Sequence, residues 1–234
     1  LRLGEARRGV QTRRARRAFR RSRGCEEGIV LLDTSILVLL VECEVLRVSH
    51  PQIKVGRGLQ HILGTSVSNI CEVARVVVVS RCKEQPCYVS ELSLLELTKV
   101  FLFKSLVHIE YHNVLESYDN ILEAPKEILN RFIRILHEAG LSIEVVAVDK
   151  QVLNIVREFL QRLKWDEDVL RKKSFDLLLF AQSVARGVKI FTTDRDFIHI
   201  RERALPPSGR DERRDRSSGL RYYEDNYIIY VGYS

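Results

Sequence analysis

Three short runs of apolar residues are spaced along the chain, at residues 29–32, 143–148 and 188–191. A strand that is apolar at every position is typical of a parallel sheet that is covered on both faces. The longer stretches between these runs have the spacing of helices. This alternation of strands and helices predicts an α/β fold, a Rossmann-like α/β/α sandwich around a central parallel sheet.

The predicted helices begin and end at residues that suit those positions. Side chains of Ser, Thr and Asp cap helix starts, Pro fits the first turn, and Gly often follows the last turn. Residues 76–79 fit either a strand or the end of a helix. The expected helices cover residues 36–44 after Thr34 or Ser35, 91–104 after Ser90, 125–139 from Pro125, 150–163 after Asp149, and 174–186 from Ser174 to Gly187.

Composition divides the chain into four segments. Residues 1–28 form a basic arm, whose ten arginines and three glutamates account for the whole net charge of +7. Residues 29–200 are the predicted domain, and residues 201–221 are charged and rich in Pro, Ser and Gly, which predicts a loop. The tyrosine-rich residues 222–234 are expected to form the last strand of the same domain, at an edge of the sheet. Because the remaining charges balance, net charge does not point to nucleic acid as a ligand of the core.

The five cysteines are an odd number and include no Cys-x-x-Cys pair. They predict buried free thiols and a cytoplasmic protein, rather than a disulfide framework or a zinc site. The apolar stretch after the arm is interrupted by Asp33 and ends near Val41. A membrane-spanning helix needs about 20 apolar residues, so neither a membrane protein nor an exported one is expected.

Four carboxylates stand out by their positions. Asp33 directly follows one predicted strand, and Asp194 follows another a few residues later. In an open parallel sheet, the carboxyl ends of the strands face the ligand crevice. Glu96 and Asp176 are surrounded by Leu and Phe, where an unpaired acid is disfavoured. Each acid alone has a simpler explanation as a helix cap, a turn residue or an ion-pair partner, and only their joint pattern favours a site.

Convergence of these acids would require a counter-charge. Two carboxylates ~5 Å apart repel each other by about 3 kcal/mol at an effective dielectric of ~20. A divalent cation removes this repulsion, and ligands that are all oxygen favour Mg²⁺ or Mn²⁺ over zinc. His108 and His112 are four residues apart and form a second, weaker candidate for a metal site, because no Glu follows His108.

Three motifs that contain these acids resemble those of PIN domains. Residues 31–35, Leu-Leu-Asp-Thr-Ser, resemble the opening motif, and residues 90–97 resemble the second, a serine six residues before a Glu-Leu pair. Asp176 on a predicted helix, followed by residues 192–197, Thr-Thr-Asp-Arg-Asp-Phe, resembles the closing motif. The resemblance covers residues 29–197.

The resemblance implies a PIN-like fold and an endoribonuclease that hydrolyses RNA with Mg²⁺ or Mn²⁺. Many relatives are toxins held by a small antitoxin, so an antitoxin partner and a homodimer are further expectations. The implied roles are catalysis and metal binding for Asp33, Glu96, Asp176 and Asp194, metal binding for Asp196, and support for Ser35 and Thr192. The nearby cations Lys172, Lys173 and Arg195 are candidates for contacts with RNA phosphates.

Two other functions fit parts of this pattern. A phosphatase of the haloacid dehalogenase type also has an Asp after its first strand, but its motif requires a second Asp where this chain has Ser35. The other alternative is a PIN-like binding module that has lost catalysis. The presence of all four acids argues against it.

Overall fold

The computed structural model describes residues 29–44, 69–82, 85–107, 140–163, 167–206, 211–214 and 220–233, with scattered residues between 127 and 138. The predicted basic arm and the pair His108 and His112 lie outside the described residues, as does much of the helix expected after Pro125. No helix within the described ranges has the length and apolar character needed to cross a bilayer.

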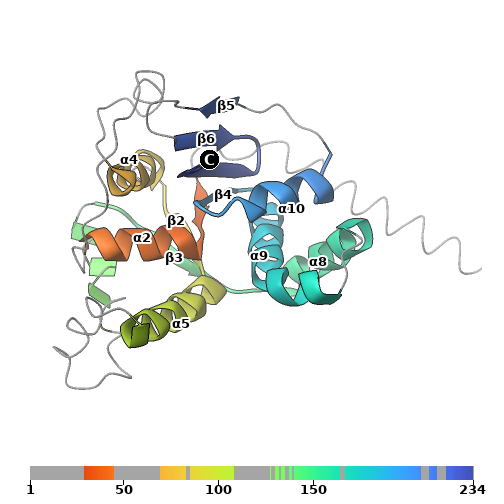
Figure 1. Cartoon of the computed structure of the whole chain (residues 1–234), viewed down its shortest axis with the longest axis horizontal. Helices are drawn as coiled ribbons and strands as arrows, with labels where there is room; N and C mark the ends of the chain where they lie inside the picture. The colour runs from red at the N-terminus through yellow and green to blue at the C-terminus, as the bar shows by residue number, and fades with distance from the viewer. Residues whose placement is uncertain are drawn as a thin grey trace, which may run out of the picture.

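A seven-stranded sheet forms the centre of the fold, with the strand order β3-β2-β1-β4-β7-β6-β5 (Figure 1). The pairings from β3 through to β7 are parallel, and β6 and β5 continue the sheet antiparallel. The strands are β1 (Val30–Leu32), β2 (Cys87–Ser90), β3 (Ile143–Val146), β4 (Lys189–Thr192), β5 (Asp211–Arg214), β6 (Leu220–Glu224) and β7 (Ile228–Tyr233).

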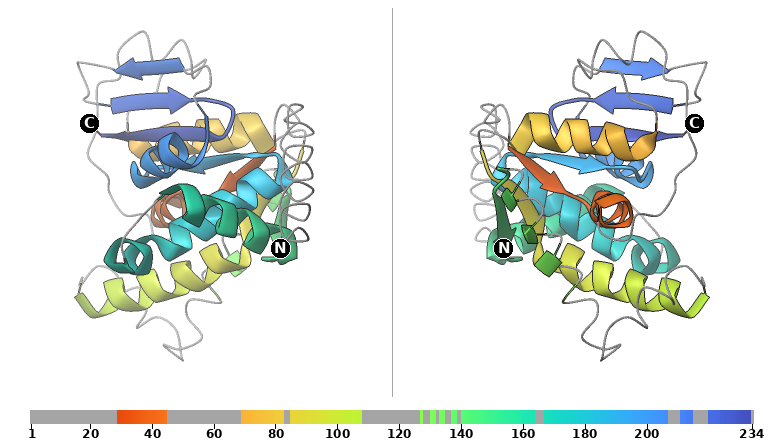
Figure 2. Two further views of the ribbon diagram at one scale, coloured as in Figure 1. Left: turned by 90° about the vertical axis from the view of Figure 1, so that its right-hand side faces the viewer. Right: turned by 90° about the vertical axis from the view of Figure 1, so that its left-hand side faces the viewer.

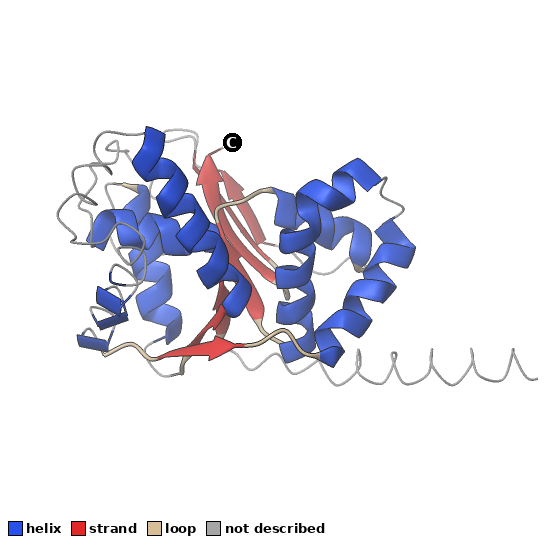
Figure 3. Cartoon of the chain, turned by 90° about the horizontal axis from the view of Figure 1, so that it is seen from below, coloured by secondary structure: helices blue, strands red, loops and turns tan. Residues whose placement is uncertain are grey.

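Helices cover both faces of this sheet, as the view along its edge shows (Figure 3). One face carries α2 (Thr34–Glu44), α4 (Ile70–Cys82) and α5 (Glu91–Val107). The other carries α8 (Lys150–Leu163), α9 (Glu167–Arg186) and α10 (Asp196–Ala204). Val30 and Leu32 of β1 pack into the first core and Leu31 into the second, which explains why the strand is apolar at every position. The predicted α/β/α fold is confirmed.

Several predicted boundaries agree with the structure. The Ser90 hydroxyl accepts a hydrogen bond from the Leu92 N–H at 3.2 Å, and an Asp149 carboxylate oxygen accepts one from the Val152 N–H at 3.0 Å. Gly140 and Gly187 have φ of 75° and 68°, a left-handed conformation that glycine adopts without strain. Residues 76–79, left open between strand and helix, belong to α4.

The start predicted for the helix that carries Asp176 is wrong. α9 begins at Glu167, so Asp176 lies in the middle of the helix and not in its first turn. The charged residues from 167 to 173 have little apolar periodicity, and the sequence pattern therefore gave no sign of these two extra turns.

The C-terminal part also differs from the prediction. Residues 211–214, within the expected loop, form β5, and residues 220–233 form the antiparallel pair β6 and β7 instead of one strand. Figure 2 shows these strands stacked at one end of the molecule. β7 lies inside the sheet, between β4 and β6, so it is not an edge strand. The tyrosines at 222, 223 and 230 are buried there.

A buried ion pair fastens this hairpin to α10. The guanidinium of Arg201 pairs with the Asp225 carboxylate, and their side chains are 5% and 0% exposed. Asp225 also accepts hydrogen bonds from the Tyr223 hydroxyl at 3.0 Å and from the N–H groups of Tyr227 and Ile228 at 2.7 and 2.9 Å. The Asp225 carboxylate thus organises the turn between β6 and β7.

We expect Asp225→Ala to lower the free energy of unfolding by about 3–5 kcal/mol, because it leaves the buried Arg201 charge uncompensated. Urea denaturation followed by circular dichroism measures this. Glu158→Ala is the matched control, since its ion pair with Arg162 is surface-exposed with the charged atoms 4.0 Å apart, and it should cost less than about 1 kcal/mol. Equal losses for the two variants would contradict a structural role for the buried pair.

The expectation of free thiols is wrong for four of the five cysteines. Cys43 is bonded to Cys71 and Cys82 to Cys87, with Cα–Cα distances of 6.1 and 5.2 Å that suit disulfides. The first bond joins the end of α2 to the start of α4, and the second joins the end of α4 to β2. Sequence spacing could not reveal the first pair, because residues 28 positions apart meet only through helix packing.

Thiol counting tests this pairing. In denaturant without reductant, iodoacetamide should modify one of the five cysteines, and after reduction it should modify all five, as intact-mass measurement would show. Modification of three or five cysteines without reductant would contradict one or both disulfides.

Candidate functional site

The strand register brings the two ends predicted to carry acids side by side. β1 and β4 are parallel neighbours with Leu32 paired to Phe191, and the N–H of Asp33 donates to the Phe191 carbonyl at 3.0 Å. Asp33 and the residues after Thr192 therefore leave the sheet at the same edge. α9 and α10 lie together on one side of this edge (Figure 1).

Hydroxyl groups hold Asp33 in a fixed position. Its carboxylate is buried and accepts hydrogen bonds from the Ser35 hydroxyl at 2.5 Å, the Thr192 hydroxyl at 2.8 Å and the Ser35 N–H at 3.2 Å. Asp33 therefore caps α2, a role that the sequence had suggested for Thr34 or Ser35. The same hydroxyls accept hydrogen bonds from the loop after β4, Ser35 from the Thr193 N–H at 3.0 Å and Thr192 from the Asp194 N–H at 2.8 Å.

Three carboxylates converge next to this network. Oxygens of Asp176, Asp194 and Asp196 all lie within 4.8 Å of one another, and we refer to these residues as the acid cluster. Asp194 also accepts a hydrogen bond from the Asp196 N–H at 2.8 Å, which fixes its side chain across the first turn of α10. The cluster combines Asp176 of α9, Asp194 of the loop after β4 and Asp196, the first residue of α10.

Glu96 is not a member of the acid cluster and is tied instead to Thr34, the residue after Asp33. Its carboxylate accepts a hydrogen bond from the Thr34 hydroxyl at 2.7 Å, so it is linked to Asp33 through the neighbouring residue. Of the five acids that the sequence singled out, Asp176, Asp194 and Asp196 form the tight group. Asp196, which the motif gave the smaller role, is one of the three.

Burial raises the pKa of three of these acids, Asp33, Asp176 and Asp194. It raises the pKa of Asp33 to about 6, against the opposing effect of its hydrogen bonds from Ser35 and Thr192. Burial also raises the pKa of Asp176 to about 6, with Lys173 opposing the rise and the charges of Asp194 and Asp33 adding to it. The pKa of Asp194 is raised chiefly by burial too. A site that disfavours bare negative charge in this way is stabilised by a bound cation.

The three predicted cations differ in their surroundings. Lys172 and Arg195 are exposed, Lys172 one residue before Lys173 on α9 and Arg195 between Asp194 and Asp196 in sequence. Lys173 instead turns inward, where its ammonium group pairs with Asp196 and lies 3.4 Å from an Asp176 carboxylate oxygen. The sequence did not separate these roles, because the run 171–173 is uniformly basic and resembles a solvated helix face.

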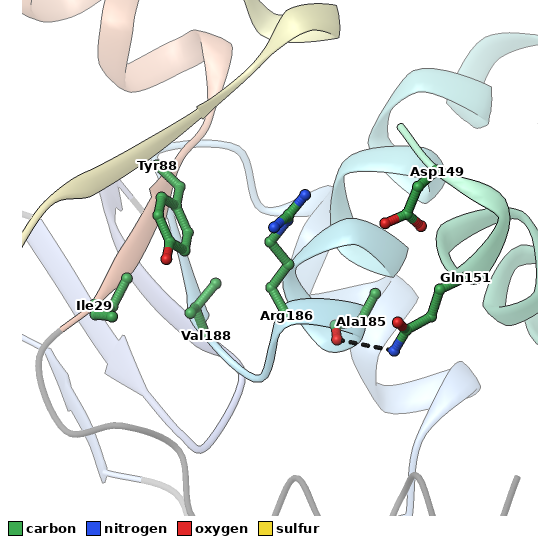
Figure 4. A pocket seen from close by; sticks show the side chains of 7 residues that line it. All are labelled: Ile29, Tyr88, Asp149, Gln151, Ala185, Arg186 and Val188. Carbon is green, nitrogen blue, oxygen red and sulfur yellow. Dashed lines mark hydrogen bonds between the residues drawn. The ribbon is translucent and has the colours of Figure 1, made fainter. Parts of the chain in front are cut away.

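A cavity elsewhere on the protein does not coincide with these acids. It has a volume of about 170 Å³ and lies at the opposite ends of β1 and β4, where Ile29, Val188 and the end of α9 border it (Figure 4). Arg186 stands over the Tyr88 ring at 5.9 Å, and the Gln151 amide donates to the Ala185 carbonyl at 3.1 Å.

The comparison with protein families agrees with this fold. The sequence matches the PIN domain family over residues 30–203, and the chain belongs to that family. PIN domains are generally nucleases, and the family assignment sets the phosphatase alternative aside. The crystal structure of VapBC2 from Rickettsia felis bound to a DNA fragment of its promoter has a similar chain, with 15% identity, a TM-score of 0.39, and coverage of 76% of this chain and 97% of that one. No curated protein has significant sequence similarity to this chain.

The residues present fit a divalent metal ion. The acid cluster offers only carboxylate oxygens, spaced closely enough for one ion to contact all three, which is the ligand chemistry of Mg²⁺ and Mn²⁺. Burial makes the ionised forms of Asp176 and Asp194 unfavourable without a cation. Both the donor set and the electrostatics therefore suit such an ion.

The raised pKa of Asp33 predicts a pH-dependent stability in EDTA. Because the folded protein holds this proton more tightly than the unfolded chain, stability is lost as pH rises from 3.8 to about 6, by on the order of 3 kcal/mol. Asp33→Asn should therefore be more stable than the parent protein at pH 7.5 and equal to it near pH 4. Urea denaturation of both proteins at the two pH values measures this, and a difference that is independent of pH would contradict it.

Proposed function

We propose that this protein is a metal-dependent endoribonuclease that hydrolyses RNA phosphodiester bonds at the acid cluster. The observation that carries the proposal is the meeting of Asp176, Asp194 and Asp196 within 4.8 Å, beside the buried Asp33, at the carboxyl edge of a PIN domain. A binding module without catalysis would have no need to keep these mutually repelling groups together.

Each group has a distinct task in this proposal. The acid cluster and Asp33 hold Mg²⁺ or Mn²⁺, which when bound supplies Lewis-acid stabilisation of the charge that develops on the phosphate. The hydroxyls of Ser35 and Thr192 orient the Asp33 carboxylate and the backbone of the loop after β4. Glu96, fixed by Thr34 at 2.7 Å, is placed as a further acid at the border of the site.

RNA is the proposed substrate because the three motifs resemble those of PIN ribonucleases. Lys172 and Arg195 are exposed and close in sequence to members of the acid cluster, and in this proposal they contact the phosphates of a strand whose scissile bond lies over the acids. These contacts carry no sequence information, so they supply affinity and orientation and not a choice of cleavage site.

Cleavage of single-stranded RNA with Mg²⁺ or Mn²⁺ tests the proposal. We expect activity that EDTA abolishes, that DNA of the same sequence does not support, and that falls about 10³-fold or more in Asp176→Asn and Asp194→Asn, since losing preorganised charge stabilisation at the reacting group typically costs this much. The rate of product formation from a 5′-labelled RNA measures this.

Glu144→Gln is the matched control, because Glu144 is an exposed acid on β3 and lies outside the acid cluster. It should cleave at the parent rate. Activity that survives in both Asp variants, or in EDTA, would sink the assignment, and complete inactivity of a protein that binds Mn²⁺ would favour the binding module.

A further inference from the structure

Lys173 places a positive charge inside the acid cluster. It lies three residues before Asp176 on α9, so both side chains project from the same face of the helix. Its ammonium group lies 3.4 Å from an Asp176 carboxylate oxygen and pairs with a carboxylate oxygen of Asp196. Lys173 therefore links the two helices that supply the acids.

The ammonium group and a metal ion would occupy overlapping space. The three carboxylates offer oxygens within 4.8 Å of one another, and Lys173 already bonds to two of these side chains. A divalent cation that contacts the same oxygens would stand within a few ångströms of the ammonium, and the two positive charges repel strongly at that distance. Binding of the metal thus requires the ammonium to leave.

The Lys173 side chain has the freedom to make this movement. It is 30% exposed, and the partner carboxylate of Asp196 is 39% exposed, so the pair borders on solvent. A lysine stem has four rotatable carbons and a strongly hydrated head group, which water accepts readily. The side chains of the Arg201–Asp225 pair, by contrast, are buried and do not border on solvent.

We propose that Lys173 is a displaceable internal counter-ion, which holds the acid cluster together before metal binds and is expelled by the incoming cation. The inference rests on the proposed function of the acid cluster as a metal site. Lys173 thereby makes metal binding weaker than the carboxylates alone would allow, and it keeps the metal-free arrangement of α9 and α10 from being pushed apart by their acids.

Calorimetric titration with Mn²⁺ alone tests this in the full chain. Lys173→Met should bind Mn²⁺ about 5–10-fold more tightly than the parent protein, because the competing charge is gone. Lys150→Met is the matched control: it removes the same charge from an exposed position at the start of α8, beside the cavity at the opposite strand ends, and should change the affinity less than about 2-fold. Lys173→Arg keeps the charge and should remain close to the parent value.

Thermal unfolding provides a second measurement that does not depend on catalysis. In EDTA, Lys173→Met should unfold at a lower temperature than Lys150→Met, because three carboxylates are left without their counter-ion. Saturating Mn²⁺ should remove this difference. A purely structural ion pair would lower stability with and without Mn²⁺ and would leave the Mn²⁺ affinity unchanged.

The outcomes separate this inference from the proposed function. If the parent protein binds Mn²⁺ and Lys173→Met binds it no more tightly than Lys150→Met, the counter-ion role is overturned and the metal-dependent nuclease stands. If neither the parent nor Lys173→Met binds Mn²⁺, both are overturned. Tighter binding by Lys173→Met in a protein that cleaves no RNA supports the counter-ion role and removes the nuclease.

Discussion

Repulsion among carboxylates gathered at one edge of the sheet is the constraint on which this structure depends. Asp176, Asp194 and Asp196 lie within 4.8 Å of one another, and Asp33 lies close enough to raise the pKa of Asp176 further. Several interactions, each weak by itself, keep these carboxylates together. Parallel register brings two strand ends side by side, hydroxyls of two distant segments hold one carboxylate, and an ammonium group neutralises part of the rest.

Much of the fold and part of the site were predictable, because burial and chain geometry leave a direct mark on sequence. Strands covered on both faces are apolar throughout, and residues that follow them reach the carboxyl edge; this reasoning placed Asp33 and Asp194 correctly. The helix caps at Ser90 and Asp149 were predictable too, because each depends only on residues close in sequence. The assignment of Glu96 and Asp176 to one region needed the family motif, since their approach depends on helix packing.

What the sequence did not reveal depends on contacts between distant segments. α9 extends two turns into a charged stretch in which Leu170 packs against the core, and β7 is internal because β6 and β5 continue the sheet beyond it. The disulfide between Cys43 and Cys71 follows from the meeting of α2 and α4. Lys173 differs from Lys172 only in the direction its side chain takes, which a run of like charges cannot encode.

α10 connects the acid cluster to the buried ion pair of Arg201 and Asp225. It begins with Asp196 of the acid cluster and holds, little more than a turn later, Arg201, whose guanidinium is locked to the hairpin by Asp225. Because α10 is short, it behaves as a rigid body, and the hairpin helps to hold the side of the site that α10 forms. Loss of the hairpin's contact with α10 is therefore expected to displace Asp196, and with it part of the cation-binding geometry.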